Sequence, residues 1–311
     1  MLKVGVIGCG NIGNAHANAW TQVEGVQLVA VCDLDLAKAQ AMAEKYNTTA
    51  YGNMDDLPAD LDIISVVTPP SAHYAVVKTL LERGKNVFCE KPLTIDVAQG
   101  EELDALAKAK NLQLGVGFKM RFEPVFQLAK ELYPEIGKLV SIVTTKLQKF
   151  DPRPDKAWVT RTGAMYELSI HDFDLLSFIT GKFPEKVIAA KVKHSRGWEK
   201  EDSFNALVDY SDGVTAALQG MYCDDTKFCF RDLTITLLGE LGYMRIERPD
   251  RIVMHTSEFR VVDVPKAVKN QFIMEFEHFR DAVLGKCENT LKASDANKMT
   301  KLIEEIRSAG E

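Results

Sequence analysis

Residues 3–13 of the chain read KVGVIGCGNIG, and this stretch decides the fold. A short apolar run of strand character is followed at once by three glycines, and the residues after them have helical character. Glycines with this spacing allow a tight turn, a close approach of the backbone to a pyrophosphate, and close packing of the helix on the strand. The helix N-terminus offers N–H groups to phosphate. The stretch predicts a dinucleotide-binding loop made of Gly8, Gly10, Asn11, Ile12 and Gly13.

An acidic residue farther along the chain supports the same prediction. Asp33 lies twenty residues after Gly13, at the end of the second apolar run, VQLVAVCD. Its carboxylate would accept hydrogen bonds from ribose hydroxyls and repel a 2′-phosphate, so the expected cofactor is NAD rather than NADP. The alternative is a simple glycine turn followed by a solvated aspartate.

The first third of the chain alternates β-branched apolar runs with helical patterns, which indicates parallel strands joined by crossover helices. The runs are apolar almost throughout, as expected for strands covered on both faces. We predict an α/β fold in which residues 1–118 form a Rossmann domain with a doubly wound parallel sheet. The predicted strands are residues 3–8, 26–33, 62–68, 86–91 and 112–118.

The pattern changes after Arg121, and residues 119–311 are predicted to form a second, α+β domain. Consecutive strand-like runs with short turns favour a mostly antiparallel sheet packed on helices. Helices are expected at 124–137 and 163–181, and two more close the chain. The amphipathic spacing of Phe272, Phe276, Phe279 and Val283 indicates core residues. The predicted strands are residues 138–149, 185–194, 203–211, 213–223, 232–240, 242–248 and 250–256.

Composition argues against several classes of partner. The 38 basic and 44 acidic residues give a net charge of −6, which is unfavourable for binding nucleic acid or an anionic membrane. The six cysteines form no C-x-x-C pair, which favours reduced thiols. We find neither a signal peptide before the first strand nor an apolar run as long as a membrane span, so a cytoplasmic protein is expected.

Residues 66–73, VVTPPSAH, are expected at the carboxyl edge of the parallel sheet, where ligands of open α/β folds bind. Thr68 can hydrogen-bond a ribose or a phosphate, and Pro69 stiffens the turn. His73 either packs near the start of a helix or contacts the ligand. All three are predicted cofactor contacts.

The next strand brings Glu90 and Lys91 to the same edge, near the expected position of a nicotinamide. The ammonium of Lys91 could hydrogen-bond a substrate hydroxyl and stabilise the alkoxide that develops as hydride leaves the carbon. Both residues are predicted cofactor contacts, and Lys91 is a candidate catalytic residue. The alternative is a surface lysine paired with Glu90.

The predicted helix 163–181 carries a candidate base. Glu167 and His171 are four residues apart, and Asp174 follows His171 by three, so the imidazole can have carboxylate neighbours. A histidine that titrates near neutral pH suits an alcohol that loses its proton as hydride departs. A structural histidine is the alternative. No zinc-binding pattern accompanies the helix, so we expect a site without metal.

Taken together, GCGNIG, TPP with His73, CEKP, GFKMRFEP and GAMYELSIHDFD resemble the glucose–fructose oxidoreductase / inositol dehydrogenase (Gfo/Idh/MocA) family of NAD(P)-dependent enzymes. The resemblance runs from Lys3 almost to the C-terminus. It implies a C-terminal domain with a large open sheet that forms homodimers or homotetramers. It also implies that Lys91 is the catalytic lysine, that His171 is the acid/base and that Lys91-Pro92 is a cis peptide.

One departure from the family pattern concerns the residue four positions before the histidine. Family members that oxidise inositols carry Asp there, whereas this chain has Glu167, which we expect to orient His171 or to bind a hydroxyl. The resemblance also implies that Lys119, Lys146 and Gln148 face the substrate. Three lysines around one pocket suggest a polyhydroxylated or partly anionic compound.

The predicted function is therefore that of an NAD-dependent oxidoreductase that transfers a hydride between nicotinamide and a secondary hydroxyl, or ketone, of a sugar or cyclitol such as inositol. A first alternative is a dehydrogenase of a glycoside or nucleotide-sugar. A second alternative is a non-catalytic NAD-binding regulator, against which the presence of both Lys91 and His171 argues.

Overall fold

The structure, a computed structural model, describes residues 1–150, 158–223 and 231–311. These residues form two compact units, one of Met1–Lys119 with Val268–Asn297 and one of Met120–Ala267 with Lys298–Glu311. The units depart from the predicted domains 1–118 and 119–311 in one main respect, because Val268–Asn297 packs with the N-terminal unit. Cys229 lies outside the described residues.

The N-terminal unit is built on a six-stranded sheet in which every pair of neighbours is parallel, in the order β3-β2-β1-β4-β5-β6. All five predicted strands are present. The sequence pattern did not reveal β3, which has only three residues. The strands are β1 Leu2–Ile7, β2 Val26–Cys32, β3 Thr49–Tyr51, β4 Ile63–Val66, β5 Asn86–Cys89 and β6 Leu114–Val116.

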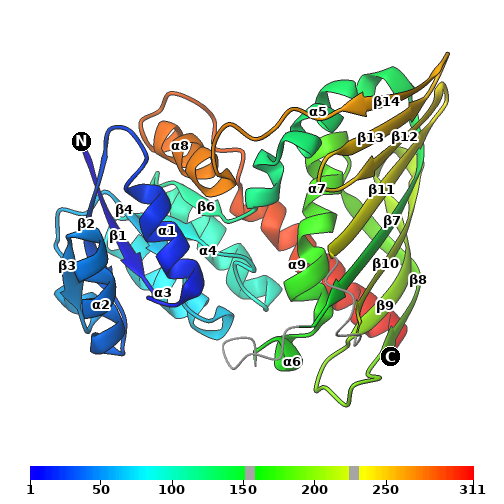
Figure 1. Cartoon of the computed structure of the whole chain (residues 1–311). Helices are drawn as coiled ribbons and strands as arrows, with labels where there is room; N and C mark the ends of the chain where they lie inside the picture. The colour runs from blue at the N-terminus through cyan, green and yellow to red at the C-terminus, as the bar shows by residue number, and fades with distance from the viewer. Residues whose placement is uncertain (151–157, 224–230) are drawn as a thin grey trace. The chain divides into compact units, whose positions relative to one another are not determined.

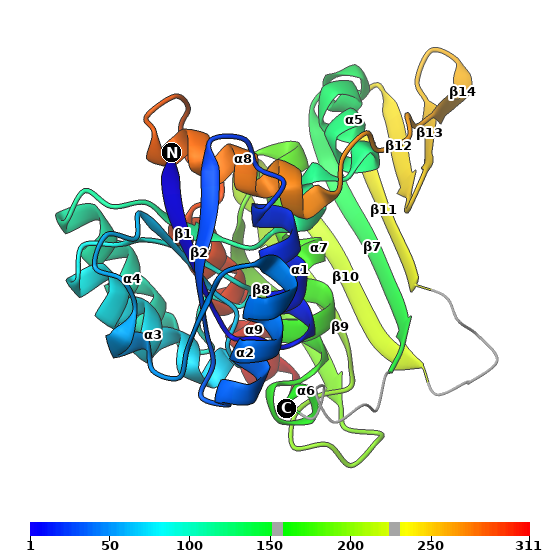
Figure 2. The same ribbon diagram turned by 60° about the vertical axis from the view of Figure 1, so that its left-hand side comes forward.

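Helices cover both faces of this sheet, and Figure 2 shows α3 and α4 on one side of β1 and β2 and α1 on the other. Their starts follow from local chemistry: Asp35 and Asp96 accept backbone N–H groups at the N-termini of α2 and α4, and Pro70 is the first residue of α3. The helices are α1 Asn11–Trp20, α2 Leu36–Tyr46, α3 Pro70–Glu82, α4 Val97–Ala109 and α8 Gln271–Val283, with a 3₁₀ turn at Met54–Asp56.

Helix α8 joins the N-terminal unit through its aromatic face. The ring of Phe276 stacks on Trp20 of α1 with centroids 4.2 Å apart, and the rings of Phe276 and Phe279 meet Phe88 of β5 edge-on. A Cβ atom at Gly115 would lie 2.7 Å from the Phe279 ring, so the glycine lets the helix approach the sheet. The amphipathic spacing correctly predicted a core helix, but it could not indicate which sheet the helix covers.

The C-terminal unit contains an eight-stranded sheet in the order β14-β13-β12-β11-β7-β10-β9-β8. Only β10 and β7 pair in parallel; the other neighbours are antiparallel, as predicted. The strands are β7 Leu139–Lys149, β8 Pro184–Lys193, β9 Ser203–Tyr210, β10 Val214–Cys223, β11 Arg231–Gly239, β12 Gly242–Glu247, β13 Arg251–His255 and β14 Phe259–Asp263, the last of which was not predicted.

Helices α5 and α7 lie against one face of this sheet (Figure 1). The predicted single helix 163–181 is divided, because a π-helical turn, Met165–Ser169, precedes α7. The remaining elements are α5 Pro124–Leu132, α6 Val159–Thr162, α7 Ile170–Thr180, α9 Ala293–Gly310 and 3₁₀ turns at Lys119–Phe122, Tyr133–Ile136 and Ser211–Gly213. No helix in the described part of the chain has the length and hydropathy of a membrane span.

Candidate active site

The loop between β1 and α1 has the geometry that its glycines predict. Gly8 has a φ of +104°, and a Cβ atom there would lie 2.5 Å from the carbonyl oxygen of Val67. A Cβ atom at Gly13 would lie 1.8 Å from the carbonyl oxygen of Gly8, so only glycine lets α1 pack this closely on the loop. At Gly10 a Cβ atom would meet nothing within 4 Å. The space in front of Gly10 is therefore open for a ligand.

Two polar features of this loop region fit a dinucleotide. Among the described residues no side chain caps the N-terminus of α1, so the helix dipole there is available to an anion. Thr68, just after β4, has a buried hydroxyl that lacks a hydrogen-bond partner within the described chain. Ordered ligand hydroxyls or phosphate oxygens satisfy such groups, so NAD fits these residues.

Asp33 lies directly after β2, and two backbone N–H groups orient its carboxylate. The N–H of Cys9 donates to Oδ2 at 2.7 Å, and the N–H of Asp35 donates to Oδ1 at 2.9 Å. A carboxylate has about four lone-pair positions, so both oxygens can still accept hydrogen bonds from ribose hydroxyls. The arrangement fits NAD, as predicted from the spacing of Gly13 and Asp33.

His73 lies on α3 in the interior, with only 1% of its surface exposed. Its Nδ1 is 2.7 Å from the carbonyl oxygen of Pro92, and its Nε2 is 2.8 Å from that of Thr68. Burial lowers the pKa of His73, although both carbonyl groups act in the opposite direction. The histidine thus links the two loops that follow β4 and β5. Pro69 is exposed and immediately precedes α3.

The loop after β5 holds Lys91, and the peptide bond between Lys91 and Pro92 is cis, which confirms that expectation. The side chain of Glu90 turns back so that Oε2 accepts the N–H of Lys91 at 3.1 Å. Its other oxygen lies 2.9 Å from Nε2 of His16, a fully buried residue of α1. The ammonium of Lys119 lies 4.2 Å from the ring centroid of Phe272.

In the C-terminal unit, His171 lies in the first turn of α7 with 9% of its surface exposed, and Glu167 is half-buried in the π-helical turn. π-helical turns are rare and occur frequently at functional sites. Gln148 is half-buried near the end of β7. The fold therefore brings Glu167 and His171 into consecutive turns, although Glu167 is not part of a regular α-helix.

Two carboxylates of α7 bind cations in the interior. Asp174 accepts two hydrogen bonds from the guanidinium of Arg121, and the one from Nε measures 2.8 Å. Asp174, which follows His171 by three residues, is therefore paired with Arg121. Asp172 pairs with Lys146 of β7, whose Nζ is 3.1 Å away and whose side chain is 4% exposed. Burial raises the pKa of Asp172, and the ammonium of Lys146 opposes that rise.

Sequence reasoning missed several polar residues of these two regions. His16 was overlooked although it follows Gly13 by three residues on the buried face of α1. Asp172 directly follows His171, and Arg121 lies in the quoted GFKMRFEP segment, so both were within motifs already recognised. Their roles could not be read from the sequence because each partner is distant in the chain, 26 residues for Lys146 and 53 for Asp174.

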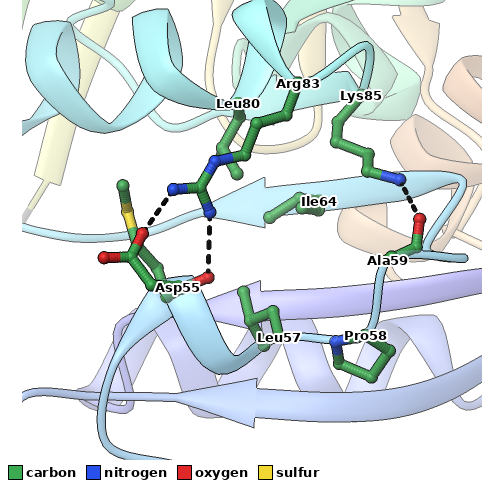
Figure 3. Close-up of a pocket in the computed structure, with 9 residues that line it drawn as sticks. Asp55, Leu57, Pro58, Ala59, Ile64, Leu80, Arg83 and Lys85 are labelled. Carbon is green, nitrogen blue, oxygen red and sulfur yellow. Dashed lines mark hydrogen bonds and ion pairs between the residues drawn. The ribbon is translucent and has the colours of Figure 1, made fainter.

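A hollow of about 250 Å³ opens at the other edge of the parallel sheet, before β4 and β5 (Figure 3). The two cationic side chains that line the hollow already have partners within the protein. Arg83 contacts Asp55, and Lys85 donates to the carbonyl oxygens of Ala59 and Leu61. Leu57, Pro58, Ile64 and Leu80 form its apolar wall. This hollow lies at the edge opposite Gly10 and Asp33 and does not contribute to the dinucleotide site.

No group of three or more His, Cys, Asp or Glu side chains that could hold a metal ion occurs within residues 1–150, 158–223 and 231–311.

Comparisons with known proteins agree with this geometry. The family described as "Oxidoreductase family, NAD-binding Rossmann fold" matches residues 2–118, and the "GFO/IDH/MocA C-terminal domain" matches residues 126–245. A UDP-N-acetylglucosamine 3-dehydrogenase of Acidithiobacillus ferrooxidans is 30% identical over 70% of this chain and 66% of its own length. An inositol 2-dehydrogenase of Rhizobium meliloti is 29% identical over 60% of this chain and 58% of its own length.

The same fold occurs in a crystal structure of an oxidoreductase from Agrobacterium radiobacter in complex with NAD+, L-tartaric acid and magnesium. The two structures superpose with a TM-score of 0.90 at 20% sequence identity, covering 99% of this chain and 96% of the other. At this identity the likeness concerns the fold alone, and it confirms the predicted combination of a parallel Rossmann sheet with a large, mostly antiparallel sheet.

Proposed function

Because the chain belongs to the Gfo/Idh/MocA family of NAD-binding oxidoreductases, we propose that it oxidises a secondary hydroxyl of a sugar or cyclitol such as inositol, or reduces the corresponding ketone. Three features carry this proposal: the open loop at Gly10, the hydroxyl of Thr68, which has no hydrogen-bond partner in the part of the chain that the structure describes, and Lys91 in the loop after β5. NAD, when bound, accepts the hydride that leaves the substrate carbon.

We assign the proton and charge chemistry to three side chains of this chain. His171 takes the hydroxyl proton as hydride leaves, and its low exposure of 9% keeps the imidazole largely away from bulk water. Lys91 donates a hydrogen bond to the substrate oxygen and stabilises the negative charge that develops there. Glu167 orients His171 or binds a neighbouring hydroxyl.

The remaining proposed contacts concern recognition. The proposed substrate contacts here are Lys119, Lys146 and Gln148. The proposed cofactor contacts are Gly8, Gly10, Asn11, Ile12, Gly13, Asp33, Thr68, Pro69, His73, Glu90 and Lys91. Because Lys146 is paired with Asp172, it would contribute a hydrogen bond rather than a net positive charge to a substrate hydroxyl. This favours a neutral polyol over a strongly anionic compound at that position.

A nucleotide-sugar is the second candidate substrate, because the relative from Acidithiobacillus ferrooxidans is named a UDP-N-acetylglucosamine 3-dehydrogenase. A non-catalytic NAD-binding regulator remains the outcome if the protein binds NAD without turnover.

Among the described residues the five cysteines are free thiols, which supports a reducing, cytoplasmic location.

We also propose a homodimer or homotetramer formed through the face of the eight-stranded sheet opposite α5 and α7. In register across three neighbouring strands, Val143, Ala217 and Leu207 form an exposed apolar row on that face. Exposed apolar rows of this kind mark protein–protein contacts.

The test is to follow NADH absorbance with a panel of inositols, aldoses, glycosides and nucleotide-sugars, and with keto-sugars and NADH in the reverse direction. Lys91→Ala and His171→Ala are expected to lower kcat by about 10²–10⁴-fold while NAD still binds. Lys108→Ala and His255→Ala replace a lysine and a histidine outside these regions and are the matched controls. Full activity of either Lys91→Ala or His171→Ala would refute the assigned chemistry.

A further inference from the structure

Four polar side chains of the N-terminal unit form a continuous chain that ends at the backbone of Lys91. Nε1 of Trp20 lies 3.1 Å from Oγ of Ser65, which lies 3.1 Å from Nδ1 of His16. Nε2 of His16 lies 2.9 Å from Oε1 of Glu90. Oε2 of the same carboxylate accepts the N–H of Lys91 at 3.1 Å. This hydrogen-bonded chain of side chains therefore joins α1, β4 and the loop after β5.

The direction of each hydrogen bond follows from the chemistry of the groups. An indole N–H can only donate, so Ser65 accepts from Trp20 and can direct its own O–H to Nδ1 of His16. An ionised carboxylate can only accept, so Nε2 of His16 carries a hydrogen and donates it to Glu90. Both oxygens of Glu90 are thus occupied, one by His16 and one by the N–H of Lys91.

Packing leaves this chain little freedom to rearrange. The His16 ring is fully buried between aromatic rings, with centroids 4.8 Å from Phe276 and 5.3 Å from Phe272. A Cβ atom at Gly117 would lie 3.1 Å from the carboxyl carbon of Glu90, so the neighbouring backbone closes off that side. Well-packed interiors hold side chains in one arrangement, and this one fixes the carboxylate relative to Lys91.

The chain is suited to holding a group in place rather than to moving protons. Its inner end is the buried indole of Trp20, whose one polar group, the Nε1–H, donates to Ser65 and cannot accept a proton in return. Burial by itself would raise the pKa of Glu90, but the hydrogen bond from His16 and the charges of Lys119 and Lys91 lower it to about 2. An always ionised carboxylate does not relay protons near neutral pH.

We propose that His16, acting through Glu90, is a positioning residue that holds the backbone at Lys91 and so aims the Lys91 ammonium at the substrate oxygen. The inference rests on the proposed function for the role of Lys91, but the contact itself can be measured without any substrate. Displacing a catalytic group by about 1 Å can lower a rate on the order of a hundredfold.

The substrate-free test measures hydrogen exchange of the Lys91 amide in the full-length protein. His16→Phe keeps a ring among the aromatic neighbours but removes the donor to Glu90, and the Lys91 amide is expected to exchange on the order of tenfold faster. His16→Gln restores an N–H near the position of Nε2 and should recover protection. Leu80→Ala, which removes buried apolar contacts at the opposite edge of the same sheet, is the control for general destabilisation.

The second measurement uses the polyol or sugar that the wild-type protein turns over. We expect His16→Phe to lower kcat on the order of tenfold to a hundredfold with KM for NAD within about threefold, and His16→Gln to recover most of the loss. Unchanged Lys91 amide exchange in His16→Phe, or an equal acceleration in Leu80→Ala, would overturn the inference. If no compound is turned over, the proposed function fails, whereas the exchange result still decides whether His16 holds Lys91.

Discussion

At the scale of single residues, Glu90 shows how hydrogen bonding can outweigh the cost of burial. The side chain is only 13% exposed, which by itself favours the neutral acid. The hydrogen bond from His16 and the nearby charges of Lys119 and Lys91 favour the carboxylate more strongly and lower its pKa from 4.5 to about 2. Folding therefore stabilises the ionised form of this residue.

This residue gives a prediction for stability in acid. The folded pKa of Glu90 lies below the unfolded one, so its contribution is complete above about pH 4.5 and is lost as the pH falls toward 2. The wild-type protein is expected to exceed Glu90→Gln in free energy of unfolding by on the order of 3 kcal/mol at pH 7. Urea titrations between pH 2 and 7 measure the difference, and a gap that does not narrow below pH 4.5 contradicts the assignment.

Asp33 gives a second prediction at this scale, which concerns the choice of cofactor. Asp33→Asn keeps the size of the side chain but removes the charge that repels a 2′-phosphate, so the ratio of KM for NADP to KM for NAD should fall by about tenfold or more. Asp35→Asn is the matched control, since Asp35 caps α2 and its replacement preserves a capping acceptor. An unchanged ratio in Asp33→Asn would mean that another group excludes NADP.

At the scale of elements, the strand–loop–helix unit of β1 and α1 separates two roles of glycine. Gly13 is required by the fold, because a Cβ atom there would lie 1.8 Å from the carbonyl oxygen of Gly8. Gly10 is not required by the fold, since its φ of −78° suits any residue and the space around it is open. The spacing of the glycines predicts both positions but does not distinguish these roles.

The pair Gly10→Ala and Gly13→Ala tests this distinction. Gly13→Ala is expected to lower the free energy of unfolding by about 3 kcal/mol or more, because backbone cannot yield to the new methyl group. Gly10→Ala should leave stability within about 1 kcal/mol of wild type while weakening NAD binding at least about tenfold, since the methyl group enters the space for the pyrophosphate. Thermal unfolding and NADH fluorescence titration measure the two effects, and equal stability losses would contradict the model of two roles.

A second lesson at this scale concerns the segment that carries Glu167 and His171. Helical periodicity correctly predicted a helix here, yet residues Met165–Ser169 form a π-helical turn before α7. A single wider turn changes the spacing of only a few side chains, so the 3.6-residue pattern of the whole segment remains recognisable. The exact direction of Glu167 relative to the helix therefore could not follow from its spacing alone.

At the scale of the whole molecule, the eight-stranded sheet presents an apolar row that the described chain leaves exposed. The residues paired in this row come from β7, β10 and β9, and Val143 and Leu207 are 39% and 38% exposed. Figure 1 shows that α5 and α7 lie on the other face of the sheet. The row thus offers a surface that a second copy of the chain can cover.

If a second copy covers it, charges placed in the row should separate the subunits. Val143→Glu combined with Leu207→Glu is expected to convert the oligomer to a monomer, because two unpaired carboxylates would be buried in each contact. Light scattering after size-exclusion chromatography measures the mass, and Val268→Glu, which places the same charge on an exposed residue outside this sheet, is the control. A wild-type protein that is monomeric at micromolar concentration would refute the proposed assembly.

The sequence by itself determined the elements and the family of this protein. Continuous apolar runs predicted five of the six parallel strands, and Gly8, Gly10, Gly13 and Asp33 predicted the dinucleotide loop, because these features depend on residues close together in the chain. Alternation predicted seven strands of the second sheet, while β3 and β14 were missed because they read TAY and FRVVD and bury none of their side chains.

Only the tertiary structure decided which distant side chains meet. It joined His16 to Glu90 across 74 residues, Lys146 to Asp172 and Arg121 to Asp174, and it assigned α8 to the first sheet. A local sequence pattern shows whether one face of a helix or strand is apolar and where a helix begins. The partner of a buried polar group is different, because it depends on which distant side chains the folded packing places beside that group.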